Sequence, residues 1–234
     1  MIKKSSHLKS RSDANNYLAL FIRDLFVVYD RGQAIDMVRG YIEDISPAKL
    51  ETQEQLTLSY LKFDFLKIVV DYEHYIQLNL PLPHKINSAQ NLTVQFCDKF
   101  PMASIIVKEV IMAMKVFKSE LRWKAIDTLS WLLTKHDYDS RYQDKPKREA
   151  IARIYLSILL LMIDEHASII SWRERADFLE QRSLMVCLLF VLKECDRNTL
   201  MDWWKHEIPS RLMIFFDLLR ICIETFEVSY MLII

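Results

Sequence analysis

The sequence predicts an all-α fold, and three observations carry that prediction. Apolar residues return at intervals of three and four along almost the whole chain, which is the period of one helix face. No segment of useful length alternates apolar and polar residues between turn signals, as a strand with one exposed face would. The 234 residues are 51% hydrophobic and include only two glycines, a composition typical of a globular protein and not of a disordered or collagen-like one.

The first predicted helix runs from about Asp13 to Tyr29, with Ser12 or Asp13 as its N-cap. Gly32 is expected to end it. Four apolar residues at helical spacing are predicted to form its buried face: Tyr17, Phe21, Leu25 and Val28. The basic residues before it are expected in a frayed terminus: Lys3, Lys4, Lys9 and Arg11.

A short second helix is predicted to carry Ala34, Met37, Val38 and Tyr41. Ser46 and Pro47 then supply an N-cap and a first-turn proline for a long third helix. Its apolar stripe repeats at three and four and consists of Leu58, Leu61, Phe65, Ile68 and Tyr72. Its polar face is expected in solvent and contains Lys62, Asp64 and Lys67.

The longest loop is predicted from Leu80 to Asn91, because Pro81 and Pro83 push the residues before them into extended geometry. The remaining helices are expected at about Pro101 to Val116, Ser119 to Thr134, Pro146 to Asp164, Asp177 to Glu194, Thr199 to His206 and Pro209 to Tyr230. Three of them begin at or beside a proline, whose missing N–H costs nothing in a first helical turn.

Eight or nine helices joined by short turns suit either a bundle or a stacked α-solenoid. Armadillo and HEAT units take roughly 40 residues each, so the chain would hold about five or six of them. The sequence shows no convincing internal repeat. Repeats of this kind keep their packing pattern, however, after their sequences have diverged. Because no composition shift marks a boundary, residues 1–234 are predicted to form one armadillo/HEAT-like α-solenoid domain.

Residue counts exclude several classes of function. Dinucleotide fingerprints, phosphate-binding P-loops and hydrolase nucleophile elbows all need glycines at spacings that Gly32 and Gly40, eight residues apart, do not offer. The 31 basic and 31 acidic residues cancel, so we expect no nucleic-acid partner. No apolar run approaches the roughly 20 residues of a transmembrane helix, and the N-terminus lacks the apolar region of a signal peptide. A cytoplasmic location is therefore expected.

Two clusters of candidate ligands or acids close predicted helices: Asp71, Glu73 and His74, and Asp164, Glu165 and His166. A zinc or general-acid role would need further residues converging on them, so we favour the simpler interpretation of histidines at helix C-termini. His206 and Glu207 begin an HExxH motif, but Ser210 stands where the second histidine belongs. No catalytic, cofactor-binding or metal-binding residue is assigned, and no cofactor is expected.

The cysteines Cys97, Cys187, Cys195 and Cys222 form no CxxC pair and are expected as reduced, buried thiols. The basic segment from Arg141 to Arg153 allows a phosphate or anionic-lipid contact, although the solvated start of a helix at Pro146 is the interpretation we favour. The tryptophan pairs are expected to pack in the core or between helices: Trp203 with Trp204, and Trp123 with Trp131.

The last five residues, from Tyr230 to Ile234, carry no polar cap. A terminal solenoid repeat needs a polar outer face, so this apolar edge is expected to associate, including with itself.

Three strings, in this order, resemble the zizimin-like branch of the dedicator-of-cytokinesis (DOCK) family. The first is Asp30-Arg31-Gly32 followed by MVRGYI, and the second is LKFDFLKIVVDYEHYIQLNLPLP from Leu61 to Pro83. The third is LLTKHDYDSRYQDKPKREAIARIYLSILLLM from Leu132 to Met162, followed by RSLMVCLLFVLK from Arg182 to Lys193. Together the strings cover most of the chain.

Members of that family are large guanine-nucleotide exchange factors for Rho-family GTPases, with a lipid-binding Dock homology region 1 and a catalytic Dock homology region 2 joined by a helical scaffold. The resemblance implies that this chain is scaffold preceding the exchange domain, that it holds none of the catalytic residues, and that it is not itself an enzyme. It further implies that a Rho-family GTPase and the membrane are reached through the parent protein.

Two departures accompany the resemblance. Only a short connection joins Met162 to Arg182, where family members often carry a long insertion, and the sequence stops at Ile234, before the exchange domain. Two alternatives stay open: a free-standing adaptor that binds a partner helix, and a small helical enzyme that uses His74 or His166.

Overall fold

The computed structural model describes residues 2–46, 51–80 and 92–231, and side chains are described for 9–46, 51–80 and 93–227. Within these ranges the secondary structure is helical and contains no strand, which confirms the all-α class. The chain divides into two compact units, Met1–Leu82 and Pro83–Ile234. The solenoid arrangement and the single domain over residues 1–234 stay predictions.

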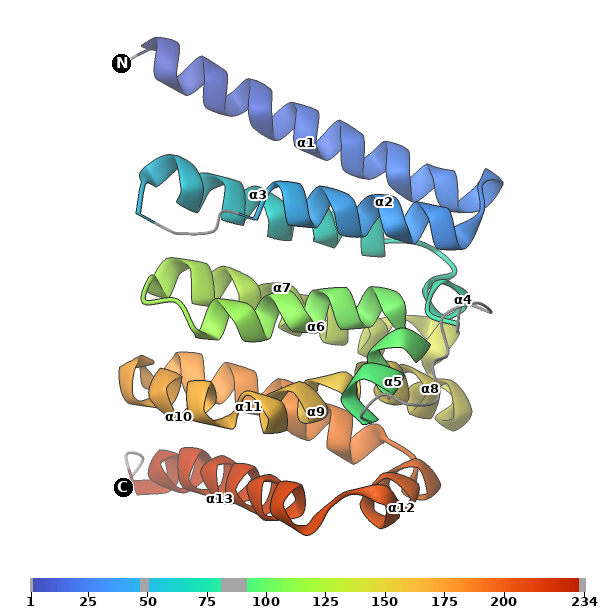
Figure 1. Cartoon of the computed structure of the whole chain (residues 1–234), viewed down its shortest axis with the longest axis vertical. Coiled ribbons are helices and arrows are strands. Elements are labelled where there is room, and N and C mark those ends of the chain that lie inside the picture. Colours follow the sequence, from blue (N-terminus) through green and yellow to red (C-terminus); the bar gives the residue numbers. More distant parts are fainter. Residues whose placement is uncertain (1, 47–50, 81–91, 232–234) are drawn as a thin grey trace. The chain divides into compact units, whose positions relative to one another are not determined.

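The first unit consists of α1 (Ile2–Val28), α2 (Arg31–Asp44), α3 (Gln53–Val70) and the short α4 (Tyr75–Leu78), with α1 packed along α3 and α2 (Figure 1). The helix α1 begins eleven residues before the predicted Asp13, so the basic terminus is helical and not frayed. Asp30 is the N-cap of α2, and its carboxylate accepts a hydrogen bond from the Gln33 amide. Gly32 therefore lies in the first turn of α2 and does not end α1.

The predicted buried face of α1 is wrong. Tyr17, Phe21 and Val28 are 71%, 59% and 82% exposed, whereas Asn15, Ala19 and Ile22 are buried. The Asn15 amide donates to the Leu61 carbonyl at 3.1 Å, and its oxygen accepts from the Tyr41 hydroxyl at 2.7 Å. One polar side chain thus joins α1 to both α2 and α3, on the face of α1 that is buried.

The third helix begins later than predicted because Thr52 forms a capping box with Gln55. Pro47 lies outside the described residues. Phe65 is buried as expected, but Lys62 is only 9% exposed and not in solvent. Its ammonium donates to the Ser46 hydroxyl at 3.1 Å and lies 5.7 Å from the centroid of the Phe63 ring.

The second unit contains α5 (Leu92–Lys99), α6 (Pro101–Met114), α7 (Ser119–Tyr138), the 3₁₀ turn η1 (Ser140–Tyr142), α8 (Lys145–Tyr155), α9 (Ser157–Asp164), α10 (His166–Arg175), α11 (Phe178–Glu194), α12 (Arg197–His206) and α13 (Pro209–Met231). Helix α6 is buried along most of its length between α7 and α9. Helix α11 packs on α7, α8 and α13 (Figure 1).

The described residues form thirteen α-helical segments, more than the eight or nine predicted. The predicted helix from Pro146 to Asp164 is two helices that meet at Leu156. The short α4 and α5 were not predicted, and neither was α10, which is bent by 84° from the segment Lys145–Asp164. The predicted loop from Leu80 to Asn91 lies almost entirely outside the described residues.

A buried ion pair joins α7 and α11 in the second unit. Arg122 and Glu180 have side chains 3% and 0% exposed, and the guanidinium contacts the carboxylate through Nε at 2.5 Å and Nη2 at 3.1 Å. The Trp172 indole of α10 donates to the same carboxylate at 2.6 Å, and Arg122 also donates to the Val116 carbonyl at 3.0 Å. These bonds satisfy the buried charges and fix three helices in one register.

Among the described residues, no single helix has both the length and the apolar composition of a membrane span; one strongly bent pair, Lys145–Asp164 with His166–Arg175, meets that test when its two parts are combined.

Candidate functional site

The predicted cluster at the end of α9 does not converge on a common point. Each of its side chains has its own ionic partner: Asp164 with Arg211, Glu165 with Lys115, and His166 with Asp217. The hydrogen bonds that Arg220 and His166 donate to the Asp217 carboxylate hold its pKa below the usual range. This cluster ties α9 and α10 to α13 and to the end of α6, which is a structural role.

The second predicted cluster lies where α3 ends. His74 is exposed at the start of α4, its ring centroid 5.8 Å from that of Tyr72, and Asp71 forms the C-cap of α3. Within the described part of the chain, no group of three histidine, cysteine, aspartate or glutamate side chains is placed to hold a metal ion.

His206 and Glu207 also turn to different partners. The His206 Nδ1 lies 2.8 Å from the Asp202 carbonyl oxygen, one helical turn earlier. The Glu207 carboxylate accepts from the Trp203 indole at 3.1 Å and pairs with Arg211 Nε at 2.9 Å. Glu207 thus joins the end of α12 to the start of α13.

Each cation of the basic segment pairs with at least one carboxylate of its own unit. The pairs are Arg141 with Asp139, Lys145 with Glu149, Lys147 with Asp144, Arg148 with Asp137 and Glu194, and Arg153 with Asp196. The hydrogen bonds from Arg141 lower the pKa of Asp139 to about 2. Asp144 caps α8 by accepting from the Lys147 amide, so this segment is the solvated helix start that we favour.

The tryptophans follow the packing prediction in part. Trp203 is 6% exposed and contacts Phe215 of α13 at a centroid distance of 5.2 Å, whereas Trp204 and Trp131 are each 38% exposed.

The four cysteines are buried, and desolvation raises the pKa of Cys187 and Cys195 to about 12. The side chains of the apolar C-terminal edge, Tyr230 to Ile234, lie outside the described residues.

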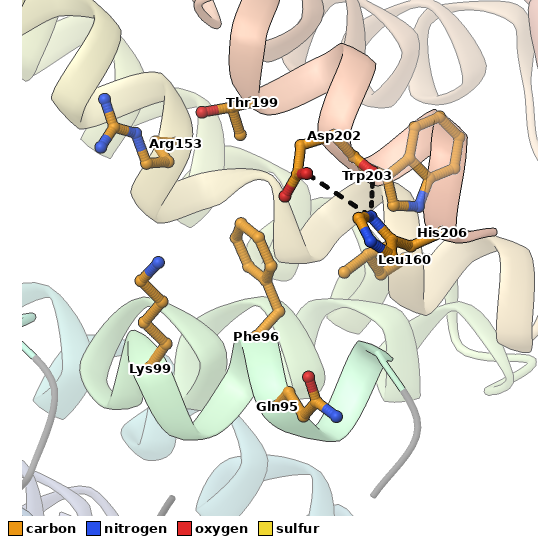
Figure 2. Close-up of a pocket in the computed structure, with 9 residues that line it drawn as sticks. All are labelled: Gln95, Phe96, Lys99, Arg153, Leu160, Thr199, Asp202, Trp203 and His206. Carbon is orange, nitrogen blue, oxygen red and sulfur yellow. Dashed lines mark hydrogen bonds and ion pairs between the residues drawn. The ribbon is translucent and has the colours of Figure 1, made fainter. Parts of the chain in front are cut away.

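The strongest candidate for a binding site is a groove that no sequence motif indicated (Figure 2). It has a volume of about 260 Å³. One wall comes from α5 and the other from α12, while α8 and α9 supply the remaining contacts; the lining residues are Gln95, Phe96, Lys99, Arg153, Leu160, Thr199, Asp202, Trp203 and His206. We name it the α5–α12 groove.

The sequence does contain one signal for the α5–α12 groove, which is the spacing of four lining residues along α12. Thr199, Asp202, Trp203 and His206 stand at positions i, i+3, i+4 and i+7, which is one face of α12. The facing wall could not be anticipated because α5 itself was not predicted. Asp196 fixes the start of α12 by accepting hydrogen bonds from the Thr199 amide at 2.8 Å and the Thr199 hydroxyl at 2.6 Å.

Comparison with known proteins adds the following. Residues 1–70 match the family model described as "DOCK6-11, TPR domain". The chain is 34% identical to human (Homo sapiens) dedicator of cytokinesis protein 9 over 165 residues, 67% of this chain and 8% of that protein. It is 23% identical to human dedicator of cytokinesis protein 7 over 301 residues, 91% of this chain and 14% of that protein.

A plant relative extends the coverage. The chain is 25% identical to guanine nucleotide exchange factor SPIKE 1 of Arabidopsis thaliana over 225 residues, 96% of this chain and 11% of that protein. No solved structure matches. The chain therefore spans between 8% and 14% of the length of these three relatives.

Proposed function

Because the chain belongs to the dedicator-of-cytokinesis (DOCK) family, we propose that it is a helical scaffold segment of a guanine-nucleotide exchange factor for Rho-family small GTPases. In this role it positions neighbouring domains of the parent protein and is not itself catalytic. The observation that carries the proposal is the alignment of 96% of this chain, which is helical without strands over its described residues, with a protein named as an exchange factor, of which it spans 11%.

The engagement of the candidate side chains supports a structural role. Glu165, His166 and Glu207 pair with residues of other helices, and Asp144 caps the start of α8. The Arg122–Glu180 pair, with its fully buried carboxylate, favours one arrangement of α7, α10 and α11. A segment that spaces other domains needs such a fixed register more than it needs reactive groups.

The first experiment measures nucleotide exchange. The isolated chain is added to Rho-family GTPases loaded with a fluorescent GDP analogue, and its helicity is checked by circular dichroism. We expect strong helical circular dichroism and nucleotide release at the intrinsic rate, with a full-length dedicator-of-cytokinesis protein as the positive control. Acceleration by the folded chain alone would show that it is catalytic.

The second experiment measures the size of the endogenous protein. An antibody raised against residues 82–91 is used to immunoblot the source cells. A band several-fold heavier than 27.9 kDa supports the scaffold of a full exchange factor, whose GTPase and membrane contacts then belong to the parent. A band near 27.9 kDa instead supports a short protein that acts by binding.

A second candidate function is a cytoplasmic adaptor that binds a partner helix or a second copy of itself. Three large apolar side chains of α1 favour it because they are exposed at helical spacing, as in a helix face that meets a partner: Tyr17, Phe21 and Val28. The self-association proposed for the C-terminal edge belongs to the same candidate. Sedimentation of the purified chain tests it: concentration-dependent dimers support the adaptor, and a monodisperse monomer at all concentrations counts against self-association.

A further inference from the structure

The size of the α5–α12 groove indicates what kind of ligand it can hold. Pockets for whole small molecules enclose about 300–1,000 Å³, whereas this groove offers about 260 Å³. It has room for one or two side chains of a larger molecule. A peptide segment of a protein partner fits it better than a free cofactor does.

The charges of the groove are separated along α12. Arg153 lies at the N-terminal end, where its Nη2 is 3.4 Å from the Asp196 carboxylate that caps the helix. Asp202 and His206 lie toward the C-terminal end, roughly two and three turns beyond Asp196. In Figure 2, Lys99 and Arg153 lie on one side of Phe96, and His206 and Trp203 lie on the other.

The cationic end is incompletely neutralised. Among the described residues Lys99 has no ion-pair partner, and its ammonium lies 5.6 Å from the centroid of the Phe100 ring. Arg153 has one carboxylate partner, and its buried Nε has no hydrogen-bond acceptor in the described part of the chain. A guanidinium has five N–H donors, so a single long contact to Asp196 leaves donors for a second carboxylate.

The apolar lining consists of Phe96, Leu160 and Trp203. In Figure 2 the Phe96 ring lies between Lys99 and His206, whereas Trp203 lies further from Phe96 than His206 does. Leu160 is fully buried and Trp203 is 6% exposed, so Phe96 offers most of the apolar surface that a ligand can reach. Aromatic surface of this kind, beside a cation, is typical of positions that contribute strongly to protein interfaces. Asp202 would repel a second acidic group at the other end.

We propose that the α5–α12 groove binds an acidic side chain of a partner's peptide segment, with its carboxylate at Lys99 and Arg153 and an adjacent apolar side chain against Phe96. The proposal deepens the protein-binding side of the scaffold function and rests on it. It concerns residues of the second unit alone.

The test begins with selection of random dodecapeptides on phage against the full chain. We expect the enriched peptides to share an acidic residue beside a bulky apolar one. A synthetic enriched peptide, labelled with fluorescein, is then titrated by fluorescence anisotropy. Replacing its acidic residue by the amide should weaken binding by about ten-fold or more, because a charge-assisted hydrogen bond is lost.

The substitution Lys99→Glu in the chain should weaken binding of the same peptide by at least about ten-fold. Lys99 is exposed on α5, so circular dichroism of this variant should match the wild type. The matched control is Lys145→Glu, the same charge reversal at a lysine 87% exposed on α8 and outside the groove, which should leave affinity unchanged.

Three results would overturn the proposal: no enrichment of peptides, enrichment without an acidic residue, or equal binding to wild type and Lys99→Glu. None of them would alter the result of the nucleotide-exchange assay or of the immunoblot. Failure of the groove and failure of the scaffold function are therefore separate outcomes.

Discussion

The two units of the chain use different kinds of buried polar group. In the first unit the neutral amide of Asn15 connects α1 with α2 and α3 through two hydrogen bonds. In the second unit the charged pair Arg122–Glu180 connects α7 with α11, and Trp172 adds α10. Both devices fix a helix register, but they differ in what their removal costs.

The cost differs because charge is harder to bury than an amide. A neutral amide that loses a partner leaves an unmet hydrogen bond, which costs about 1–3 kcal/mol. A buried ion that loses its partner costs about 3–5 kcal/mol, since it is neither hydrated nor compensated. The second unit should therefore be the more sensitive of the two to a single polar substitution, although the intact ion pair adds little net stability.

The largest expected effect is that of Glu180→Gln. The substitution keeps the size of the side chain but leaves the Arg122 guanidinium, 3% exposed, without its counter-charge. We expect the free energy of unfolding to fall by about 3–5 kcal/mol. In hydrogen exchange, protection of the α7 and α11 amides should fall while that of α3 is unchanged.

Two further variants serve as controls for Glu180→Gln: one breaks an exposed ion pair, and the other removes both charges of the buried pair. Glu149→Gln removes the partner of the exposed Lys145 and should cost less than about 0.5 kcal/mol. The double substitution Arg122→Met with Glu180→Leu removes both charges and should recover part of the loss. Equal losses for Glu180→Gln and Glu149→Gln would contradict the contrast between buried and exposed pairs.

The next largest effect is the pH dependence of the free energy of unfolding that arises from His136. This imidazole is 4% exposed, and desolvation lowers its pKa from 6.5 to about 4. Because the folded-state pKa is the lower one, the stabilisation is complete above pH 6.5 and is lost as the pH falls toward 4. The loss between pH 7 and pH 4 amounts to about 3 kcal/mol.

The contribution of His136 is obtained by subtracting the unfolding free energy of a variant without this histidine from that of the wild type at each pH. Unfolding in urea is followed for wild type and His136→Gln over the same pH range, since glutamine does not titrate. The wild type should lose about 3 kcal/mol more than the variant on acidification, while carboxylates affect both chains alike. A constant difference between the two curves would show that the folded protein protonates His136 as readily as the unfolded chain.

Much of the fold was accessible from the sequence, because long helices with strong caps carry local signals. Helices α6, α11 and α13 lie within two residues of their predicted limits, and two of them begin at prolines. The break at Leu156 was missed since the apolar period continues across it. The bend at Glu165 depends on partners distant in the sequence, such as Lys115 and Asp217, which no local pattern reveals.

The candidate site was less accessible than the fold. The α5–α12 groove joins residues from four helices, and the positions of Phe96 and Arg153 relative to α12 are set by tertiary packing. The family was accessible because three strings that resemble it stand in order along the chain. The sequence clusters that looked chemical, such as Asp164-Glu165-His166, were dispersed by the fold into separate ion pairs.

The smallest predicted effect tests which face of α1 is buried in the first unit, where two adjacent residues differ in exposure. Ile22 is 4% exposed and Phe21 is 59% exposed. Ile22→Val, which removes one methyl group from the core, should cost about 1 kcal/mol of unfolding free energy. Phe21→Ala removes a whole ring but should change stability by less than about 0.5 kcal/mol. Hydrogen exchange of the α3 amides reports both variants, and a larger loss for Phe21→Ala would restore the face that the apolar spacing predicts.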